Sequence, residues 1–419
     1  MPSTGRRAMR SKDVRPEAPL LPGRTIGILG GGQLGRMIAL AGRAMGYRFA
    51  VLDPAEEAPA RPVADVFVRG DFSDRAALLR LGAASDVVVY EFEHLDAEAV
   101  AALAESVPVP QGTALLRLAQ HRALEKAALS AGGFPVAPYA AIARPEDWPA
   151  ALRTVGLPAL LKTTTGGYDG KGQWRLRTAA EAAAAEAIVR AAFRETGAGR
   201  SGEARAEGDA AGARFILERE LAFRAELSVI VARRADGAMA NFPPAENVHV
   251  RGILHRSIVP ARVPKTVEER AVELARAIAT HLDAVGLLAV EFFWLKDGAL
   301  VVNELAPRPH NTGHYTLDAA STSQFEQFVR AVSGLPLGAV RLWSPVVMVN
   351  VLGEHLPALL KALPTLDPRF KVHLYGKAEA RPGRKMGHVN ILADSVEEAL
   401  RLAEATGVWP ELQAERENP

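Results

Sequence analysis

Short apolar runs alternate with amphipathic stretches in the first quarter of the chain. Residues 25–29 and 87–90 are continuous apolar runs, as in strands that are buried on both faces of a parallel sheet. The elements predicted between them are helices at 33–45 and 74–81 and strands at 48–52 and 66–68. This order predicts a parallel sheet with helices on both of its faces.

Further along, strands and helices follow one another less regularly, which is typical of an α+β arrangement. Two apolar strands flank the turn at 296–298 and predict a hairpin. The other predicted elements are strands at 136–142, 214–218, 226–231, 345–352 and 371–374, and helices at 120–131, 145–154, 267–285 and 396–406. Residues 194–212 lack apolar periodicity and are expected to form a solvated or poorly ordered insertion.

Length and composition limit the class of protein. A chain of 419 residues exceeds one ordinary core, and we expect a disordered tail at 1–23 followed by domains at 24–119, 120–337 and 338–419. The formal net charge is only +2, with acids and bases interspersed, so no nucleic-acid partner is expected. No apolar stretch could span a membrane, and the absence of cysteine fits a reducing compartment. We therefore expect a cytoplasmic protein.

Residues 165–173 contain four glycines and Lys171, directly after a predicted strand. Glycine buries no side chain and costs chain entropy, so a packing role does not explain this density. The N–H groups of such a loop can approach phosphate oxygens, and Lys162 and Lys171 supply positive charge. The loop is not a Walker A motif, which requires glycine where the chain has Thr165. An ordinary flexible hairpin turn is the alternative.

Carboxylates interrupt both apolar strands of the predicted hairpin. Glu291 lies in the run 289–294, and Asn303 and Glu304 lie in the run 300–308. Antiparallel pairing would bring Glu291 opposite Asn303 or Glu304, so that two carboxylates and an amide converge on one face. Magnesium prefers a few carboxylates together with phosphate oxygens and water. The apolar neighbours imply burial, which argues against edge carboxylates that merely face solvent.

A second glycine-rich turn follows the first predicted strand. It has the pattern G-x-G-x-x-G at Gly30, Gly32 and Gly35, and Asp53 ends the next strand. Taken alone, this pattern is the fingerprint of a nicotinamide-binding fold, so a dehydrogenase is an alternative function. Nothing downstream supplies hydride chemistry, and a dehydrogenase would leave the phosphate and metal motifs unexplained.

Three of these features resemble the nucleotide and metal motifs of the ATP-grasp superfamily, namely 166–173, Glu291 and 303–314. From about residue 25 onward, the whole chain more closely resembles the 5-(carboxyamino)imidazole ribonucleotide synthase family, the ATP-dependent carboxylases of purine synthesis. Four more segments carry this resemblance: 30–37, 90–94, 252–254 and 381–388. Their order and spacing across nearly the whole chain make it specific.

The resemblance implies an α/β and α+β fold of ATP-grasp architecture, with a Rossmann-like N-terminal domain and a small C-terminal domain. It implies that bicarbonate attacks the γ-phosphate of ATP to give carboxyphosphate and ADP. The exocyclic amine of 5-aminoimidazole ribonucleotide then takes the carboxyl group, either directly or through released carbon dioxide, which forms a C–N bond and releases phosphate. ATP and Mg²⁺ are the implied cofactors, and the family suggests a homodimer.

The resemblance also assigns residues to the nucleotide and the metal. Magnesium is expected at Glu291 and Glu304, assisted by Asn303. The expected ATP-binding residues lie on the glycine loop, the adenine linker and the strands around them: Arg122, Lys162, Gly167, Tyr168, Asp169, Gly170, Lys171, Gly172, Gln173, Glu218, Arg219, Glu220, Leu221, Glu226, His249, Asn303 and Glu304. A surface cation remains the alternative for Arg122, and a structural imidazole remains the alternative for His249.

The catalytic residues implied by the resemblance are Arg308, His310, Asn311, Tyr168 and Asp169. A guanidinium can hold a planar anion such as bicarbonate through two hydrogen bonds, and this is the expected role of Arg308. Tyr168 and Asp169 are expected to orient the aminoimidazole. Zinc is not expected, because the histidines at 310 and 314 lack the HExxH pattern.

The ribonucleotide is expected to occupy a second phosphate site. Gln33, Leu34 and Glu93 are expected to face the ribose. Lys377, Arg384 and Lys385 are expected to hold its phosphate. Without the resemblance, a solvated basic loop would be the default interpretation of these three cations.

Other functions share part of this pattern. Formate-dependent glycinamide ribonucleotide transformylase shares the ATP features, but its first loop typically carries Glu where this chain has Gln33. A biotin carboxylase is a weaker enzyme alternative. A nucleotide-binding sensor is the non-enzymatic alternative, and the presence of Glu291, Glu304 and Arg308 argues against it.

Overall fold

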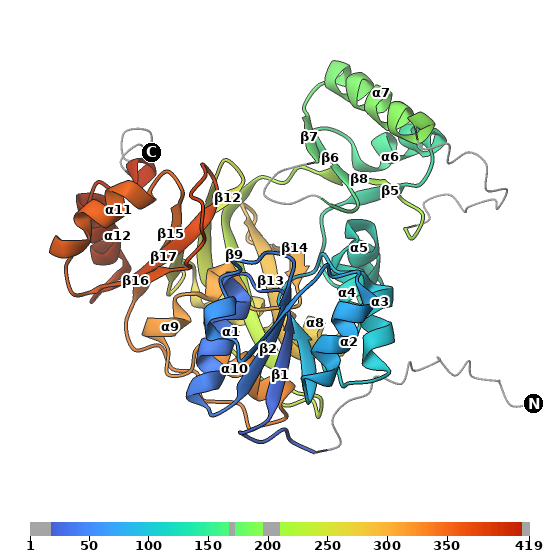
Figure 1. Cartoon of the computed structure of the whole chain (residues 1–419). Coiled ribbons are helices and arrows are strands. Elements are labelled where there is room, and N and C mark those ends of the chain that lie inside the picture. Colours follow the sequence, from blue (N-terminus) through green and yellow to red (C-terminus); the bar gives the residue numbers. More distant parts are fainter. Residues whose placement is uncertain (1–17, 167–171, 196–209, 413–419) are drawn as a thin grey trace, which may run out of the picture.

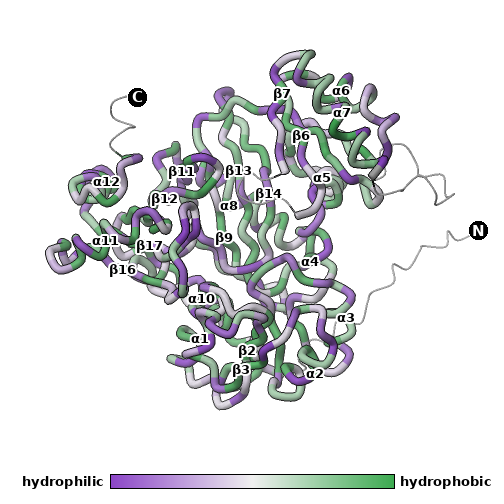
Figure 2. Tube along the Cα trace, turned by 45° about the horizontal axis from the view of Figure 1, so that its top comes forward, coloured by the Kyte–Doolittle hydropathy of each residue, from purple (hydrophilic) through white to green (hydrophobic). Residues whose placement is uncertain are grey.

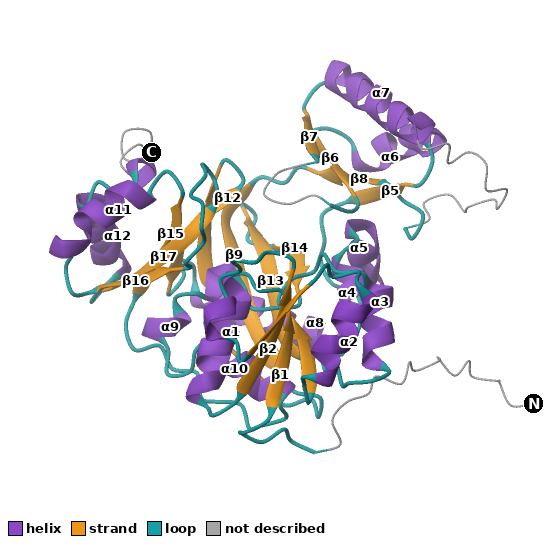
Figure 3. Cartoon of the chain, viewed as in Figure 1, coloured by secondary structure: helices purple, strands orange, loops and turns teal. Residues whose placement is uncertain are grey.

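The fold was analysed in a computed structural model, which describes residues 18–166, 172–195 and 210–412. Its described part contains three β-sheets with helices packed against them (Figures 1 and 3). The candidate glycine-loop residues Gly167, Tyr168, Asp169, Gly170 and Lys171 lie outside the described residues. Most of the insertion expected at 194–212 also lies outside them.

The N-terminal sheet is parallel, as its apolar runs predict, and has the strand order β3-β2-β1-β4. Phe49 and Val51 of β2 point into one core, while Ala50 and Leu52 point into another, because successive side chains of a strand face opposite ways. The elements are β1 (Thr25–Leu29), α1 (Gln33–Ala44), β2 (Arg48–Asp53), η1 (Arg61–Val63), β3 (Val66–Arg69), α2 (Arg75–Ala83), β4 (Val87–Tyr90) and α3 (Ala97–Ala104).

The largest sheet has nine strands, in the order β14-β13-β9-β11-β12-β15-β17-β16, with β10 paired to β9. Its central strands β9 and β13 are strongly apolar and pass through the middle of the molecule (Figure 2). Its strands are β9 (Phe223–Arg233), β10 (Met239–Asn241), β11 (Ala245–Val250), β12 (Ile253–Val259), β13 (Gly286–Leu295), β14 (Leu300–Ala306), β15 (Val346–Leu352), β16 (Phe370–Leu374) and β17 (Lys385–Leu392).

Helices cover both faces of this sheet. Helix α8 (Lys265–His281) packs on one face of β9, and α10 (Gln324–Val332) packs on the other and also meets α1. Phe325 and Phe328 of α10 therefore share one core with Ile38 of α1, which joins the N-terminal sheet to the central one. The remaining helices beside the sheet are α4 (Ala114–Ala119), α5 (Arg122–Ala131), η3 (Asn311–Gly313), α9 (Thr316–Ala319), α11 (Leu356–Ala362), η4 (Leu363–Thr365) and α12 (Val396–Ala405).

The third sheet stands apart at the upper right of Figure 1 and has its own core. Its antiparallel strands have the order β5-β8-β6-β7, and α6 and α7 cover one face. Trp148 and Leu217 are almost completely buried between the sheet and these helices. The elements are β5 (Tyr139–Ile142), η2 (Pro145–Asp147), α6 (Trp148–Val155), β6 (Ala159–Thr163), β7 (Gln173–Leu176), α7 (Ala179–Glu195) and β8 (Phe215–Arg219).

Several sequence expectations need correction. The helix predicted at 120–131 begins at Arg122, because the His121 side chain accepts a hydrogen bond from the N–H of Leu124 and caps it. The helix predicted at 267–285 ends at His281, and Asp283 has a positive φ of 47°. Other elements were not predicted, among them helices α3, α7 and α10 and strands β7, β11, β12 and β17. Strand β17 was missed because His388 and Asn390 interrupt its apolar pattern, although both are buried.

Residues 18–23, which were expected to belong to the disordered tail, are part of the fold. Within residues 18–23, the N–H of Leu20 donates to the carbonyl of Ser333 at 2.8 Å, and the Leu20 side chain packs on the core shared by α1 and α10. The Tyr47 hydroxyl donates to the carbonyl of Leu20. Residues 18–23 therefore belong with the folded chain, and the three domain ranges stay a prediction.

Trp409 provides a test of the C-terminal packing. Its ring is 1% exposed among β15, β17 and α12, and its Nε1–H donates to the carbonyl of Asn350 at 2.9 Å. We expect Trp409→Ala to lower the free energy of unfolding by about 3–5 kcal/mol, measured by urea titration. Trp343→Ala is the matched control, because Trp343 is 65% exposed. Equal losses in the two variants would contradict the assigned packing.

Candidate active site

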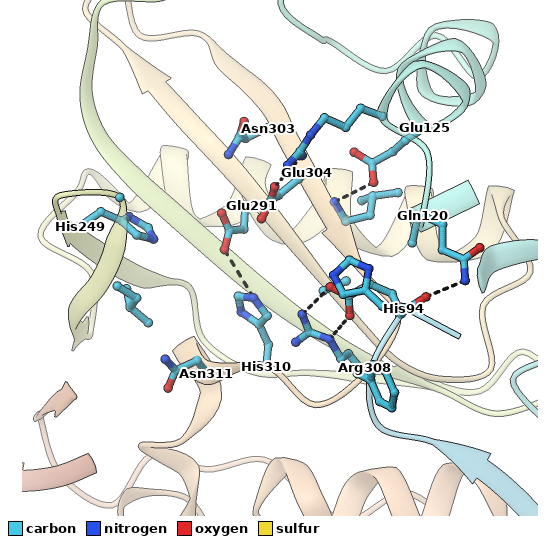
Figure 4. A pocket seen from close by; sticks show the side chains of 18 of the residues that line it. His94, Gln120, Glu125, His249, Glu291, Asn303, Glu304, Arg308, His310 and Asn311 are labelled. Carbon is cyan, nitrogen blue, oxygen red and sulfur yellow. Dashed lines mark hydrogen bonds and ion pairs between the residues drawn. The ribbon is translucent and has the colours of Figure 1, made fainter. Parts of the chain in front are cut away.

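A cavity of about 820 Å³ lies where the three sheets approach one another. The side chains labelled in Figure 4 line it from the loop after β4, from the end of α4, from α5, from β11, and from the hairpin β13–β14 with the segment that follows it. Most of the predicted site residues that the structure describes line this cavity: Gln33, Leu34, Glu93, Arg122, Lys162, Gln173, Glu226, His249, Glu291, Asn303, Glu304, Arg308, His310, Asn311 and Lys385.

The predicted hairpin is confirmed, and a β-bulge sets its carboxylates. Val290 pairs with Leu305, and Phe292 pairs with Val302, so Glu291 alone opposes both Asn303 and Glu304. A bulge of this kind re-aims side chains next to a site. Here it turns both carboxylates into the same cavity (Figure 4).

The two carboxylates fit a magnesium ion that is completed by phosphate oxygens. Burial raises the pKa of Glu291 to about 8, and the charge of Glu304 adds to the shift. Arg122 lies 3.6 Å from Oε2 of Glu304, and His310 lies 3.5 Å from Oε1 of Glu291. The pKa of Glu291 nevertheless stays raised, so a divalent cation would add neutralising charge to this pair. In the described ranges, no cluster of three or more His, Cys, Asp or Glu residues could hold a metal by itself. Ligands from the nucleotide are therefore needed to complete the coordination.

A second, smaller cavity of about 80 Å³ adjoins the main cavity at Lys162. The predicted adenine-linker residues line the smaller cavity: Glu218, Arg219, Glu220 and Leu221. Lys162 lines both cavities, and its Nζ lies 3.0 Å from Oε2 of Glu218. Although burial raises the pKa of Glu218, the charges of Lys162 and Lys126 outweigh this effect and lower it. A buried, ionised Glu218 therefore holds Lys162 at the border between the two cavities.

Sequence reasoning missed Lys126, which is 2% exposed and lines the smaller cavity. Its Nζ donates to the carbonyls of Val302 and Asn303 at 3.2 and 2.7 Å and lies 3.9 Å from Glu218. It thereby fixes the strand that carries Asn303 and Glu304. A signal was available, because Lys126 lies four residues after Arg122 and so on the same face of helix α5.

Glu226 and His249 line the cavity beside the carboxylates of Glu291 and Glu304, and they contact each other. Nδ1 of His249 contacts Oε2 of Glu226. Burial lowers the pKa of His249, but the hydrogen bond and charge of Glu226 outweigh this and raise it. The imidazole is thus biased toward its cationic form, which suits a position near phosphates.

Only the flanks of the predicted glycine loop are described. Gly166 and Gln173 line the cavity, and Gly172 has a φ of 68°. A Cβ at Gly172 would lie 2.7 Å from Oγ1 of Thr163, so this position requires glycine for both backbone and space. The roles predicted for Gly167, Tyr168, Asp169, Gly170 and Lys171 stay predictions.

Arg308, which was expected to hold an anion, makes a two-pronged ion pair with Glu93. Its Nε and Nη2 donate to the two carboxylate oxygens at 2.5 and 2.9 Å (Figure 4). Burial raises the pKa of Glu93, but the Arg308 charge outweighs it and lowers the pKa to about 2. Glu93 thus orients Arg308 across the cavity, a link that no sequence pattern indicated.

His310 and Asn311 lie on the other side of Arg308. Nε2 of His310 is 3.5 Å from Oε1 of Glu291, and its Nδ1 is 2.9 Å from Oγ1 of Thr312. Burial and the nearby charges of Arg308 and Lys385 keep the pKa of His310 well below its ordinary value. The neutral imidazole of His310 therefore lies between Glu291 and Arg308. The side-chain amide atoms of Asn311 are buried without a hydrogen-bond partner among the described residues.

The three predicted phosphate cations differ in position. Lys385 lines the cavity, and Nζ of Lys377 donates to the carbonyl of Lys385 at 2.7 Å. Arg384 is more exposed and donates to the carbonyl of Glu379 at 2.7 Å. Burial, together with the charges of Arg384 and Lys385, lowers the pKa of Lys377 to about 8. The mutual repulsion of these cations would be relieved by a bound phosphate.

Three family models match the chain in the order of its domains. Residues 23–120 match a ribonucleotide synthetase preATP-grasp domain, residues 127–325 an ATP-grasp domain, and residues 346–402 a phosphoribosylaminoimidazole carboxylase C-terminal domain. In the described part of the chain, no helix is both long and apolar enough to cross a membrane.

Similar proteins extend over nearly the whole chain. N5-carboxyaminoimidazole ribonucleotide synthase of Bacillus subtilis is 44% identical over 390 residues, covering 93% of this chain and 96% of that protein. An N5-carboxyaminoimidazole ribonucleotide synthetase solved with ADP is 46% identical, has a TM-score of 0.87, and covers 95% and 100% of the two chains. The Aspergillus clavatus synthase, solved with ADP and 5-aminoimidazole ribonucleotide, is 31% identical with a TM-score of 0.80, covering 91% and 97%.

The cavity, the three matched domains and this coverage agree with one another. The chain belongs to the N5-carboxyaminoimidazole ribonucleotide synthase family, the ATP-grasp ligases that carboxylate aminoimidazole ribonucleotide in purine biosynthesis.

Proposed function

We propose that this chain carboxylates 5-aminoimidazole ribonucleotide with ATP and bicarbonate, through carboxyphosphate and with Mg²⁺, and that it acts in the cytoplasm as a homodimer. One observation supports this most strongly. The bulge that places Glu291 against Asn303 and Glu304 opens into the same cavity as Arg308 and Lys385. A phosphoryl-transfer centre and a ribonucleotide phosphate site would then share one enclosed space.

The first step requires ATP and bicarbonate to meet despite their like charges. We assign the adenine to the smaller cavity lined by Glu218–Leu221 and the phosphates to Lys162, Arg122 and His249. Glu291 and Glu304, assisted by Asn303, would hold magnesium, which when bound neutralises charge on the transferring phosphoryl group. Arg308 would orient bicarbonate for attack on the γ-phosphorus, with ADP as the leaving group.

In the second step, the exocyclic amine attacks the carboxyl carbon of carboxyphosphate. The C–N bond forms as the C–O bond to phosphate breaks, and the proton that the amine loses is taken up by the released phosphate. We assign the ribonucleotide to the end of the cavity formed by Gln33, Leu34, Glu93 and Lys385. Neutral His310 can accept a hydrogen bond there without repelling Arg308.

The decisive experiment measures ADP release by the purified chain. We expect release with bicarbonate to depend on 5-aminoimidazole ribonucleotide, and the product to be its N-carboxylated form. Formate with glycinamide ribonucleotide serves as the comparison, because the transformylase shares the ATP features. Faster ADP release with formate and glycinamide ribonucleotide would reject the proposed substrates while leaving the ATP site in place.

The lowered pKa of Lys377 predicts a pH dependence. Lys377 loses its charge as the pH rises through about 8, whereas the substrate phosphate stays dianionic. We therefore expect kcat/KM for the ribonucleotide to fall between about pH 7 and 9, while kcat/KM for ATP changes less. In Lys377→Gln, kcat/KM for the ribonucleotide should be lower and should no longer change with pH over this range. Lys371→Gln, on the exposed face of β16, is the control and should keep the wild-type pH dependence. A wild-type slope that survives in Lys377→Gln would contradict the assignment.

A further inference from the structure

The glycine turn between β1 and α1 is closed by a carboxylate of the protein itself. The N–H of Gly32 donates to Oε1 of Glu91 at 2.7 Å, and the N–H of Gly35 donates to Oε2 at 2.9 Å. Glu91 directly follows β4 and is only 6% exposed. A third N–H of the turn, that of Gly31, donates to Asp53 at 2.7 Å. Three N–H groups of the turn that could bind a pyrophosphate are therefore already occupied by carboxylates of the chain itself.

The glycines of this turn make room for Glu91. A Cβ at Gly30 would lie 2.5 Å from Cγ of Glu91, and a Cβ at Gly32 would lie 2.6 Å from its Oε1. Gly30 also has a φ of 107°, which disfavours other residues. The G-x-G-x-x-G pattern is thus explained by an internal carboxylate, which removes the structural basis for a nicotinamide site.

The closed turn presents two residues to the cavity. Gln33 and Leu34 lie between the N–H groups of Gly32 and Gly35, and both line the cavity. Helix α1 has no side-chain cap of its own and no acidic residue in its first turn. Glu91 supplies that negative charge from another strand, at the positive end of the helix. The Glu91 carboxylate also interacts electrostatically with Arg308. The guanidinium of Arg308 donates a hydrogen bond to Glu93, which lies two residues after Glu91.

We propose that Glu91 is a positioning residue, whose carboxylate locks the glycine turn so that Gln33 and Leu34 fit the ribonucleotide. This inference rests on the proposed substrate. Glu91 also borders the cavity, but each of its carboxylate oxygens accepts a hydrogen bond from a backbone N–H of the turn, so its main effect is assigned to the turn. Its loss should weaken ribonucleotide binding and leave ATP binding almost unchanged, because the nucleotide end lies on other elements.

Chemical rescue tests this role directly. Glu91→Ala removes a CH₂–COO⁻ group, which is an acetate ion in size, charge and shape. We expect KM for the ribonucleotide to rise about tenfold, as for one lost charge-assisted hydrogen bond, with less than a twofold change in KM for ATP. Added acetate should restore the KM, whereas acetamide should not. Burial raises the pKa of Glu91 to about 7, and the N–H groups of Gly32 and Gly35 lower it, so an assay near pH 8 keeps the wild-type carboxylate ionised.

Two further variants keep the test decisive. Glu91→Gln retains the volume, but its NH₂ group cannot accept from a second N–H, so it should raise the same KM without responding to acetate. Asp147→Asn is the matched control, because Asp147 is a buried carboxylate that accepts from the N–H groups of Ala143 and Arg144, far from the turn. It should leave the ribonucleotide KM unchanged.

The outcomes separate the two proposals. Wild-type protein that does not consume the ribonucleotide rejects the proposed function. Wild-type activity with an unchanged ribonucleotide KM in folded Glu91→Ala and Glu91→Gln rejects the role of Glu91. Equal rises in both KM values, or rescue by acetamide as well as acetate, would indicate general packing and would likewise overturn it.

Discussion

Glu304→Gln is expected to reduce turnover by roughly a hundredfold or more while leaving the fold intact. Glu304 shares with Asn303 the bulge that opposes Glu291, so its carboxylate is one of two that would hold the magnesium ion, and this cation would neutralise charge on the transferring phosphoryl group. Replacing this carboxylate with an amide removes one negative charge from the proposed magnesium site but keeps the volume of the side chain. The measurement is ADP release at saturating ATP and ribonucleotide.

A second measurement separates metal binding from general damage. Because Glu304 raises the pKa of Glu291 by repulsion, Glu304→Gln should not lower the melting temperature without magnesium. The additional stabilisation by magnesium and ATP should be lost. Glu273→Gln, on the exposed surface of α8, is the matched control and should behave as wild type. Wild-type ADP release by Glu304→Gln would reject the metal assignment.

Replacing Arg384 and Lys385 together with Ala is expected to raise KM for the ribonucleotide more than tenfold. Each charge-assisted hydrogen bond to phosphate is worth roughly 1.5–3 kcal/mol, and about 1.4 kcal/mol corresponds to a factor of ten. Neither residue belongs to the ATP-binding strands, so KM for ATP should change little. Steady-state kinetics with each substrate varied separately provides the measurement.

Single substitutions show how much each of the two cations contributes to the rise in KM for the ribonucleotide. Lys385 lines the cavity, whereas Arg384 is bound to the carbonyl of Glu379, so Lys385→Ala should carry most of the loss. Arg381→Ala removes a cation from the same turn, but Arg381 is exposed and paired with Glu379. This variant should leave both KM values unchanged. An equal loss for ATP and ribonucleotide in the double variant would place the phosphate site elsewhere.

Local patterns predicted the elements well where a strand or helix is uniform along its length. The apolar runs of β1, β2 and β4 predicted the parallel sheet, and the turn at 296–298 predicted the hairpin that carries Glu291 and Glu304. Local sequence patterns did not predict β17, because the polar residues His388 and Asn390 interrupt its apolar pattern although both are buried. Asn390 donates to Asp318 at 2.6 Å, a partner far away in the sequence, so only the tertiary structure shows why it can be buried.

The sequence by itself predicted the chemical groups of the site: the glycine-rich loop, the paired carboxylates, and the basic turn near residue 384. The composition of the first two already indicates phosphate or metal binding, whereas the basic turn was assigned to phosphate only through the family resemblance. Only the tertiary structure decided how these groups are paired. It joined Arg308 to Glu93, placed Lys126 against the carbonyls of Val302 and Asn303, and filled the glycine turn with Glu91. Those partners are far apart in the chain, and a buried charge must find its partner in space, so no local pattern could have indicated them.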